Sequence, residues 1–297
     1  MPPGVGAVLS YWPFEPAVIL GVELAAVLYL VGGARRGAAS RSTQSSATAR
    51  WRSIAFWSGL ATILLALQSP IDILARQLFW VHMVQHLLLM AVAAPLLALA
   101  SPWTRMWRAL PLGLRRSVAK PLFRDPRLSP VRWIYRQVAR PSVTWFLVVF
   151  NLWLWHAPVM YDITLKYHLV HHLEHVLFLG LSLAFWAQVI DQVPFHARLG
   201  SLARSAYVFS AMIASWGLAA ILSFATGPFY AYALLPSRPG GISALTDQQL
   251  GGGMMWVPGA IPYSIAFVAL LFRWLADEDA RPRLSPAEID MGATSGS

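Results

Sequence analysis

Long apolar runs constrain this chain more than any other feature of its sequence. Seven stretches approach the length of about 20 residues that a helix needs to cross a bilayer core. They lie at 16–33, 52–69, 77–100, 142–158, 168–190, 205–226 and 252–275. The chain is 57% hydrophobic and 12% charged, which excludes an ordinary soluble globular protein. We therefore predict an all-α, polytopic membrane bundle of about seven helices, forming one domain over 1–275 with a polar, flexible cytoplasmic tail at 276–297.

The positive charges predict how this bundle is oriented. Twenty of the 23 lysines and arginines fall in the gaps on one side of the predicted helices, and only Arg76, Lys166 and Arg238 fall on the other. By the positive-inside rule, the N-terminus lies outside and the C-terminus inside. The basic segment 101–141 mixes tryptophan with arginine and is broken by prolines, so we expect amphipathic pieces on the inner leaflet. The net charge of +10 then indicates anionic lipid as a partner and not nucleic acid.

Two histidines stand one helical turn apart inside the third apolar run. His82 and His86 share one helix face, with Met83 beside them and Met90 a further turn along. A single histidine in a membrane helix more often hydrogen-bonds to a neighbouring helix than binds a metal. The spacing of this pair makes a shared metal about as good an interpretation as packing.

The predicted topology places seven of the eight histidines on the outer side, at similar depth. The eighth, His196, falls in an inner gap. In the run 168–190, His168, His172 and His175 follow one helical stripe, which we expect to face the third run. The four histidines of this run cannot all face one ligand, so we expect His171 or His168 to lie near the membrane interface. His171 and His175 form a second pair at one-turn spacing. The chain has no cysteine, so a metal here would be held by histidine, methionine, carboxylate or backbone groups.

Other polar or soft side chains fall at the same predicted depth. Asp247 and the thioethers of Met254 and Met255 are candidate ligands, although methionine in a membrane helix is more often packing. Glu174 and Asp72 are candidate acceptors that would fix the tautomer of a metal-binding histidine. Glu174 is equally well interpreted as a solvated carboxylate. We also expect the adjacent glycines 251–253 to let two helices approach closely.

Five sequence blocks together resemble the CtaG family of cytochrome c oxidase assembly proteins, over roughly residues 69–275. They are SPID (69–72), FWVHMVQHLLLM with AAPLL (79–90 and 93–97), WHAPVMYD (155–162), HxxEH (171–175) and DQQLGGGMMWVPG (247–259). The resemblance implies a factor of the bacterial plasma membrane that is not an enzyme and helps a haem-copper oxidase to mature by delivering copper at the outer face. Oxidase subunits, and a soluble outer-side copper chaperone, would be its partners.

The leading hypothesis is therefore an outer copper site that passes on its ion by ligand exchange. Its candidate ligands are His82, His86, His172, His175, His168, His156, Met83, Met254, Met255 and Asp247. A haem-binding redox protein is the main alternative, with one axial imidazole from 77–100 and one from 168–190. A passive scaffold, whose histidines only hydrogen-bond between helices, is a third.

Overall fold

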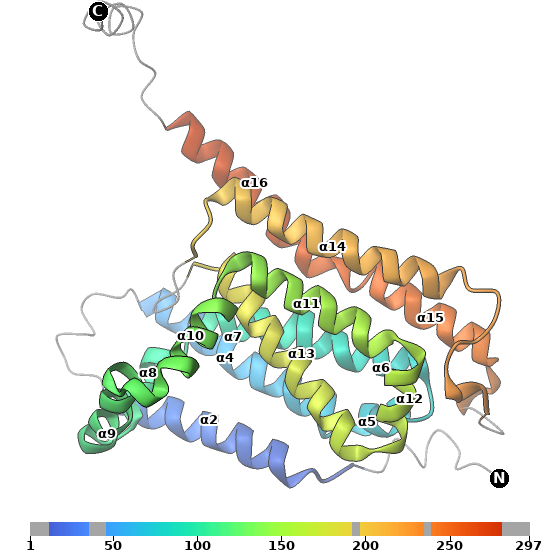
Figure 1. Ribbon diagram of the computed structural model, residues 1–297, viewed down its shortest axis with the longest axis horizontal. Coiled ribbons are helices and arrows are strands. Elements are labelled where there is room, and N and C mark those ends of the chain that lie inside the picture. Colours follow the sequence, from blue (N-terminus) through green and yellow to red (C-terminus); the bar gives the residue numbers. More distant parts are fainter. Residues whose placement is uncertain (1–11, 36–45, 192–196, 235–238, 281–297) are drawn as a thin grey trace, which may run out of the picture.

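The computed structural model describes residues 12–35, 46–191, 197–234 and 239–280, and in these every regular element is helical. Long helices lie side by side as a bundle (Figure 1). They include α2 (Pro16–Ala34), α4 (Ser46–Leu67), α11 (Pro141–His156), α13 (His168–Val189) and α14 (Ser201–Ser223). The predicted all-α class is confirmed.

The third apolar run forms a continuous but irregular helix, the most deeply buried of the long apolar helices. It consists of α6 (Phe79–Leu87), the π-helical η1 (Leu88–Ala93) and α7 (Ala94–Ala100). Pro95 lacks a backbone N–H, so a regular α-helical hydrogen bond cannot form at that point. The wider π turn before Pro95 absorbs this defect and lets the helix continue to Ala100. This helix contacts α4, α13 and α15, and therefore lies at the centre of the bundle.

The last apolar run is longer than predicted and is interrupted by a short break at 257–259. It begins with α15 (Ala244–Trp256), capped by the Ser243 side chain, and continues as α16 (Ala260–Asp279). A Cβ atom on Gly251 would collide with the ring of Phe79, and one on Gly252 would collide with Ser223. The expected close approach is therefore confirmed at these two glycines, although no neighbour lies within 4 Å of such an atom at position 253. This approach presses α15 against α6 and α14.

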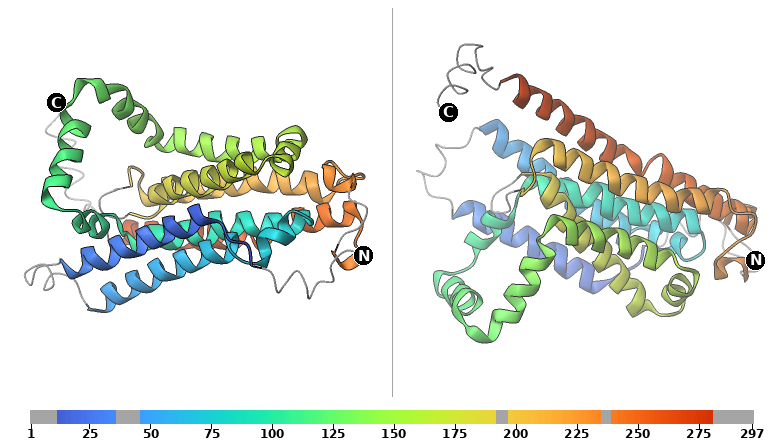
Figure 2. Two further views of the ribbon diagram at one scale, coloured as in Figure 1. Left: turned by 90° about the horizontal axis from the view of Figure 1, so that it is seen from below. Right: turned by 45° about the horizontal axis from the view of Figure 1, so that its top comes forward.

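The basic segment forms short helices at one end of the bundle (Figures 1 and 2). These are α8 (Trp103–Ala109), α9 (Leu112–Arg124), η2 (Pro126–Leu128) and α10 (Ser129–Val138). Helix α8 packs closely on α2: the absence of a side chain at Gly32 makes room for the Arg105 carbonyl oxygen, with which a Cβ atom would collide. The short helices α5 (Pro70–Ala75) and α12 (Pro158–Lys166) lie at the opposite end.

Among the described residues, five helices are long and apolar enough to cross a membrane, or six if the bent pair α10–α11 is one span. The angle within that pair is 81°. Helix α4 matches the second predicted span, but Arg50 and Arg52 near its start lower its mean hydropathy. The molecule thus has the helices of a membrane protein, while the count of seven and the orientation remain predictions.

Candidate metal centre

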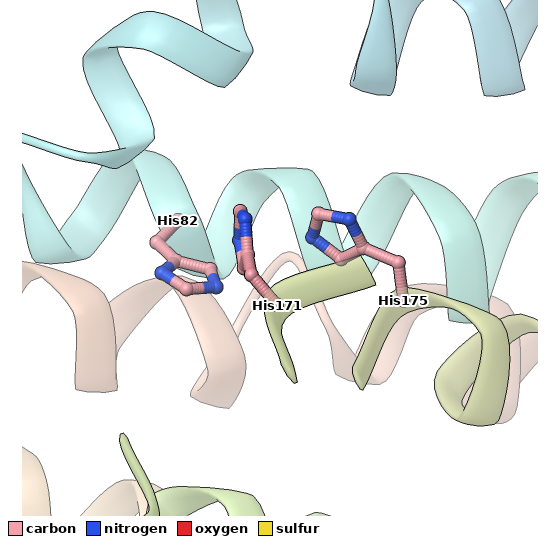
Figure 3. A group of neighbouring side chains, drawn as sticks. All are labelled: His82, His171 and His175. Atoms are coloured by element: carbon pink, nitrogen blue, oxygen red, sulfur yellow. The ribbon is translucent and has the colours of Figure 1, made fainter. Parts of the chain in front are cut away.

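Four histidines and one glutamate are buried together where α6 faces α13. His82 and His86 come from α6, and His171, Glu174 and His175 come from α13. None of the five is more than 6% exposed. Figure 3 shows the rings of His82, His171 and His175 lying side by side between the two helices. These five residues are called the buried cluster below.

The buried cluster contains two overlapping groups of possible metal ligands. In each group one ligand atom per residue lies within 4.8 Å of the others: His82, His171 and His175 form one group, and His82, His86 and Glu174 the other. The Nε2 atoms of His82 and His86 are 2.8 Å apart. The Glu174 carboxylate oxygens lie 3.7 Å from the first of these nitrogens and 3.6 Å from the second. A single ion could therefore contact both helices.

Five ligand atoms of the buried cluster have no hydrogen-bond partner. They are both carboxylate oxygens of Glu174, Nδ1 of His86, and Nε2 of His171 and of His175. Buried polar atoms in folded proteins are nearly always hydrogen-bonded, and a buried carboxylate needs a proton or a cation beside it. So many unsatisfied atoms at one point are the pattern expected of a ligand set.

A tyrosine pair fixes the orientation of His82. The Tyr161 hydroxyl lies 2.7 Å from Nδ1 of His82 and donates its own proton to the Tyr232 hydroxyl, 3.3 Å away. Tyr232 donates in turn to the Ala75 carbonyl oxygen. Burial raises the pKa of Tyr161 well above its usual value, so the phenol stays neutral. The Tyr161 oxygen therefore accepts a hydrogen bond from the Nδ1–H group of His82, which leaves Nε2 of that ring with a lone pair directed toward the buried cluster.

A second arrangement, beside the buried cluster, brings an imidazole against a thioether. His156, at the end of α11, has Nδ1 2.7 Å from the Leu152 carbonyl oxygen, so this nitrogen carries the proton. In the neutral ring, Nε2 then bears only a lone pair, and it lies 3.2 Å from the Met83 sulfur, which also has no proton to give. Burial without a countercharge disfavours the imidazolium that would resolve this contact.

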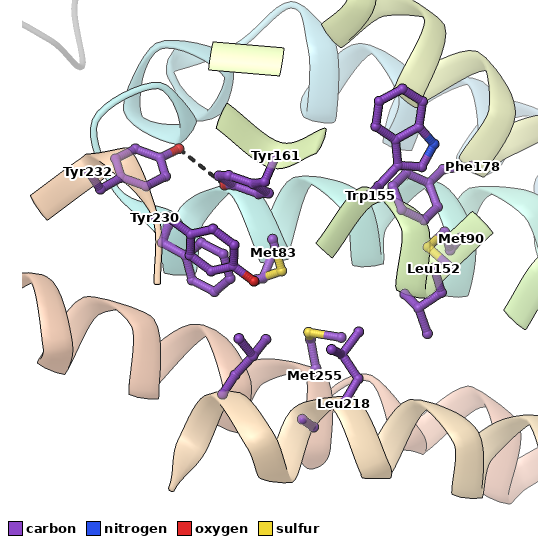
Figure 4. Close-up of a cluster of buried hydrophobic side chains, with 13 residues drawn as sticks. Met83, Met90, Leu152, Trp155, Tyr161, Phe178, Leu218, Tyr230, Tyr232 and Met255 are labelled. Carbon is purple, nitrogen blue, oxygen red and sulfur yellow. Dashed lines mark hydrogen bonds between the residues drawn. The ribbon is translucent and has the colours of Figure 1, made fainter. Parts of the chain in front are cut away.

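These two residues belong to a narrow cavity of about 40 Å³ next to His86. The methionine and histidine side chains that line this cavity are Met83, His86, Met90, His156 and Met255. Figure 4 shows the three methionines among the aromatic and aliphatic side chains that surround them. We call this group the thioether pocket; it supplies soft ligands within reach of the imidazoles of the buried cluster.

The structure turns a different face of α13 inward from the one the sequence analysis expects. His171 enters the buried cluster, whereas His168 and His172 lie at its edge, near Arg76 and Glu15. The inward face of α13 is set by a stripe of buried residues that continues along the helix from His175 through Phe178, Ser182 and Phe185. The sequence predicts neither His171 nor Tyr161 as part of the site. The spacing of His171 one helical turn from His175 is a pattern that could have identified His171, whereas no sequence pattern marks Tyr161. His196 lies outside the described residues.

The structure does not bring Asp247, Asp72 and Met254 into the buried cluster. The Asp247 carboxylate accepts hydrogen bonds from the first two N–H groups of α6, at 2.9 and 3.0 Å, and so caps that helix. Asp72 accepts from Arg76 at 2.9 Å and from Gln85 at 3.0 Å. Met254 lines a separate pocket on another face of α15.

Comparison with known proteins gives one family and three relatives. The sequence model of the family described as cytochrome c oxidase caa3 assembly factor matches residues 27–277. Uncharacterized proteins of Mycobacterium bovis and Mycobacterium tuberculosis are each 27% identical to this chain over 292 residues, and one of Mycobacterium leprae is 25% identical over 294. Each match covers 94% of this chain and 42% of the relative, so the chain spans less than half the length of these curated relatives. No solved structure matches.

Proposed function

Because the chain belongs to the cytochrome c oxidase caa3 assembly factor family, we propose that it binds copper in the buried cluster and passes the ion to a haem-copper oxidase during assembly. In this proposal the protein sits in the bacterial plasma membrane with the buried cluster toward the outer side. Oxidase subunits receive the copper, a soluble outer-side chaperone supplies it, and anionic lipid binds the basic segment at 101–141.

The observation that carries this proposal is the state of Glu174. Its two oxygens are fully buried, have no hydrogen-bond partner, and face the Nε2 atoms of His82 and His86 at 3.7 and 3.6 Å. A copper ion between these groups would neutralise the carboxylate and use the lone pairs of the imidazoles. A bound copper ion would thus explain both why the Glu174 carboxylate has no hydrogen-bond partner and why the rings of His82 and His86 converge on it.

The thioether pocket favours copper over other metals. Imidazole binds several transition metals, but thioethers select soft ions such as Cu(I). The lone pairs of His156 Nε2 and Met83 Sδ face each other at 3.2 Å, a contact that a soft cation between them would make favourable. His86 borders both the buried cluster and the pocket, so copper can move from one to the other by exchanging ligands. No bond in a substrate need be broken in such a transfer.

The cavities beside the buried cluster argue against the haem alternative. Sites for small organic ligands usually have volumes of about 300–1,000 Å³. The two cavities that reach His82 and His86 measure about 230 and 40 Å³. A larger cavity of about 580 Å³ is bordered by His172 and His175, but both come from α13 and cannot bind opposite faces of one haem.

The experiment that tests the proposal is copper analysis of purified protein after a chelator wash, which strips exposed sites. Wild type is expected to retain copper, and a His82→Ala/His86→Ala variant is expected to lose it. A His168→Ala/His172→Ala variant is the matched control, because it removes two histidines outside the buried cluster and should keep this copper. Equal copper in wild type and in the His82/His86 variant would refute the proposal. An absorption spectrum of the same samples reveals haem if a Soret band persists through purification.

A further inference from the structure

A second group of possible metal ligands lies near the surface, outside the buried cluster. Glu15, His168 and His172 each offer one ligand atom, and these atoms lie within 4.8 Å of one another. The side chains of His172 and Glu15 are 41% and 27% exposed, and His172 Nε2 is 3.6 Å from a Glu15 oxygen. Solvent reaches these groups, unlike those of the buried cluster.

Both sides of this group are held in place. The backbone N–H of Glu15 donates to the Gln68 side-chain oxygen at 3.1 Å, and the Gln68 amide nitrogen donates back to the Glu15 carbonyl oxygen at 3.1 Å. This reciprocal pair ties the start of α2 to the end of α4. His168 and His172 stand one turn apart on α13, with ring centroids separated by 6.3 Å. The ligands therefore come from anchored helices, which lowers the entropy cost of binding an ion.

A guanidinium group occupies the position next to these ligands. Arg76 lies 2.9 Å from Nε2 of His168 and 3.9 Å from a Glu15 oxygen, and it forms an ion pair with Asp72 at 2.9 Å. A metal ion held by the three ligands would replace Arg76 at His168 and Glu15, because both cations use the same lone pairs. Arg76 would keep its ion pair with Asp72.

A cavity extends from His168, one ligand of this surface group, to the buried cluster. It measures about 230 Å³ and is lined by Arg76 and His168 as well as by His82 and His171. The ring centroids of His172 and His171 are 6.5 Å apart, and those of His171 and His82 are 5.1 Å apart. An ion at the surface group would stand one ligand-exchange step from the buried histidines.

We propose that Glu15, His168 and His172 form a second metal site, which binds a divalent transition-metal ion in competition with Arg76 and passes it, without a change of oxidation state, to the imidazoles of the buried cluster. Two imidazoles and one carboxylate, without a thioether, suit divalent ions better than Cu(I). The receiving role rests on the copper function proposed above, whereas the existence of the site does not.

The test is a titration of the purified full chain with Cu(II) alone and with Zn(II) alone, which counts ions that a chelator removes easily. Wild type is expected to bind one such ion at this site. His168→Ala/His172→Ala and Glu15→Gln should abolish or weaken that binding while the chelator-resistant copper stays. Arg76→Gln should tighten it by about fivefold, because a competing positive charge is gone. Metal affinity should thus rise in Arg76→Gln and fall in the ligand variants, whereas a general disturbance of the fold would lower it in all of them.

Two results would overturn the second site: the same number of easily removed ions in wild type and in the His168/His172 variant, or weaker binding in Arg76→Gln. The two proposals fail separately. Loss of the easily removed ion alone, with chelator-resistant copper unaffected by His82→Ala/His86→Ala, would refute the buried cluster and retain the surface site. The reverse pattern would refute the surface site and retain the buried cluster.

Discussion

Replacing Glu174 by glutamine should change the stability of the metal-free protein and its affinity for copper in opposite directions. Glutamine keeps the shape of the side chain and removes its negative charge. In the metal-free protein both Glu174 oxygens are buried without a partner, so this charge is a cost. In the copper-bound protein the same charge would stabilise the ion between His82 and His86.

A buried polar group without a partner costs about 1–3 kcal/mol, and a charged one costs more. The amide of glutamine is also left unpaired, so Glu174→Gln removes only the additional cost of the charge, on the order of 1 kcal/mol. About 1 kcal/mol corresponds to roughly 2–4 °C in the unfolding midpoint of a domain of 150–250 residues. Metal-free Glu174→Gln should therefore unfold a few degrees higher than wild type. With carboxylate oxygens 3.6 and 3.7 Å from the imidazole nitrogens, loss of the carboxylate should weaken copper binding by about 10–100-fold.

The assay is thermal unfolding of purified protein with and without copper, joined to a competition titration with a chelator of known affinity. Copper should raise the midpoint of wild type more than that of Glu174→Gln. Asp279→Asn is the matched control, since Asp279 is an exposed acid at the end of α16 and its replacement should change neither quantity. The reasoning is wrong if Glu174→Gln lowers the metal-free midpoint and leaves the copper affinity within about twofold of wild type.

Three further substitutions test the surroundings of the site. Met83→Leu should weaken Cu(I) binding by about tenfold, whereas Met254→Leu should leave it unchanged, as measured by competition with a Cu(I) chelator. Tyr161→Phe removes the acceptor of the His82 Nδ1 proton and should weaken copper binding by about 10–100-fold; unchanged binding would exclude a role for Tyr161 in orienting the ring. Asp247→Ala should lower stability by about 0.5–2 kcal/mol because it uncaps α6, yet keep the copper content after a chelator wash; loss of copper from a folded variant would restore Asp247 as a ligand.

The histidines show how far sequence reasoning reaches into this site. Successive predicted spans cross the membrane in opposite directions, which places His82, His86, His156 and the start of α13 at one end of the bundle. The structure brings these parts of the chain together. Sequence reasoning chose the wrong face of α13, however, because two stripes of histidine overlap at its start. The face of α13 that packs inward is decided further along the helix, where Phe178 and Phe185 must be buried.

Asp247 shows a second limit of the same kind. An acid before a glycine and methionine run is a reasonable metal ligand in a linear sequence, at the same predicted depth as the histidines. Its partners are N–H groups 167 and 168 residues away, at the start of α6. Their position depends on how closely α15 approaches α6, and that approach depends on the contact of Gly251 with Phe79. No local pattern contains this information.

The sequence by itself determined that the chain is helical, that its helices are those of a membrane protein, and that most histidines gather at one end. Apolar length and the order of the helices suffice for these conclusions, because the bilayer core sets the length that a span needs. Successive spans then cross it in opposite directions. Only the tertiary structure decided which rings meet, which nitrogen of His82 carries the proton, and that the Glu174 carboxylate is buried without a hydrogen-bond partner. Successive residues on a helix point about 100° apart, so a small change in how α13 packs exchanges one set of ligands for another.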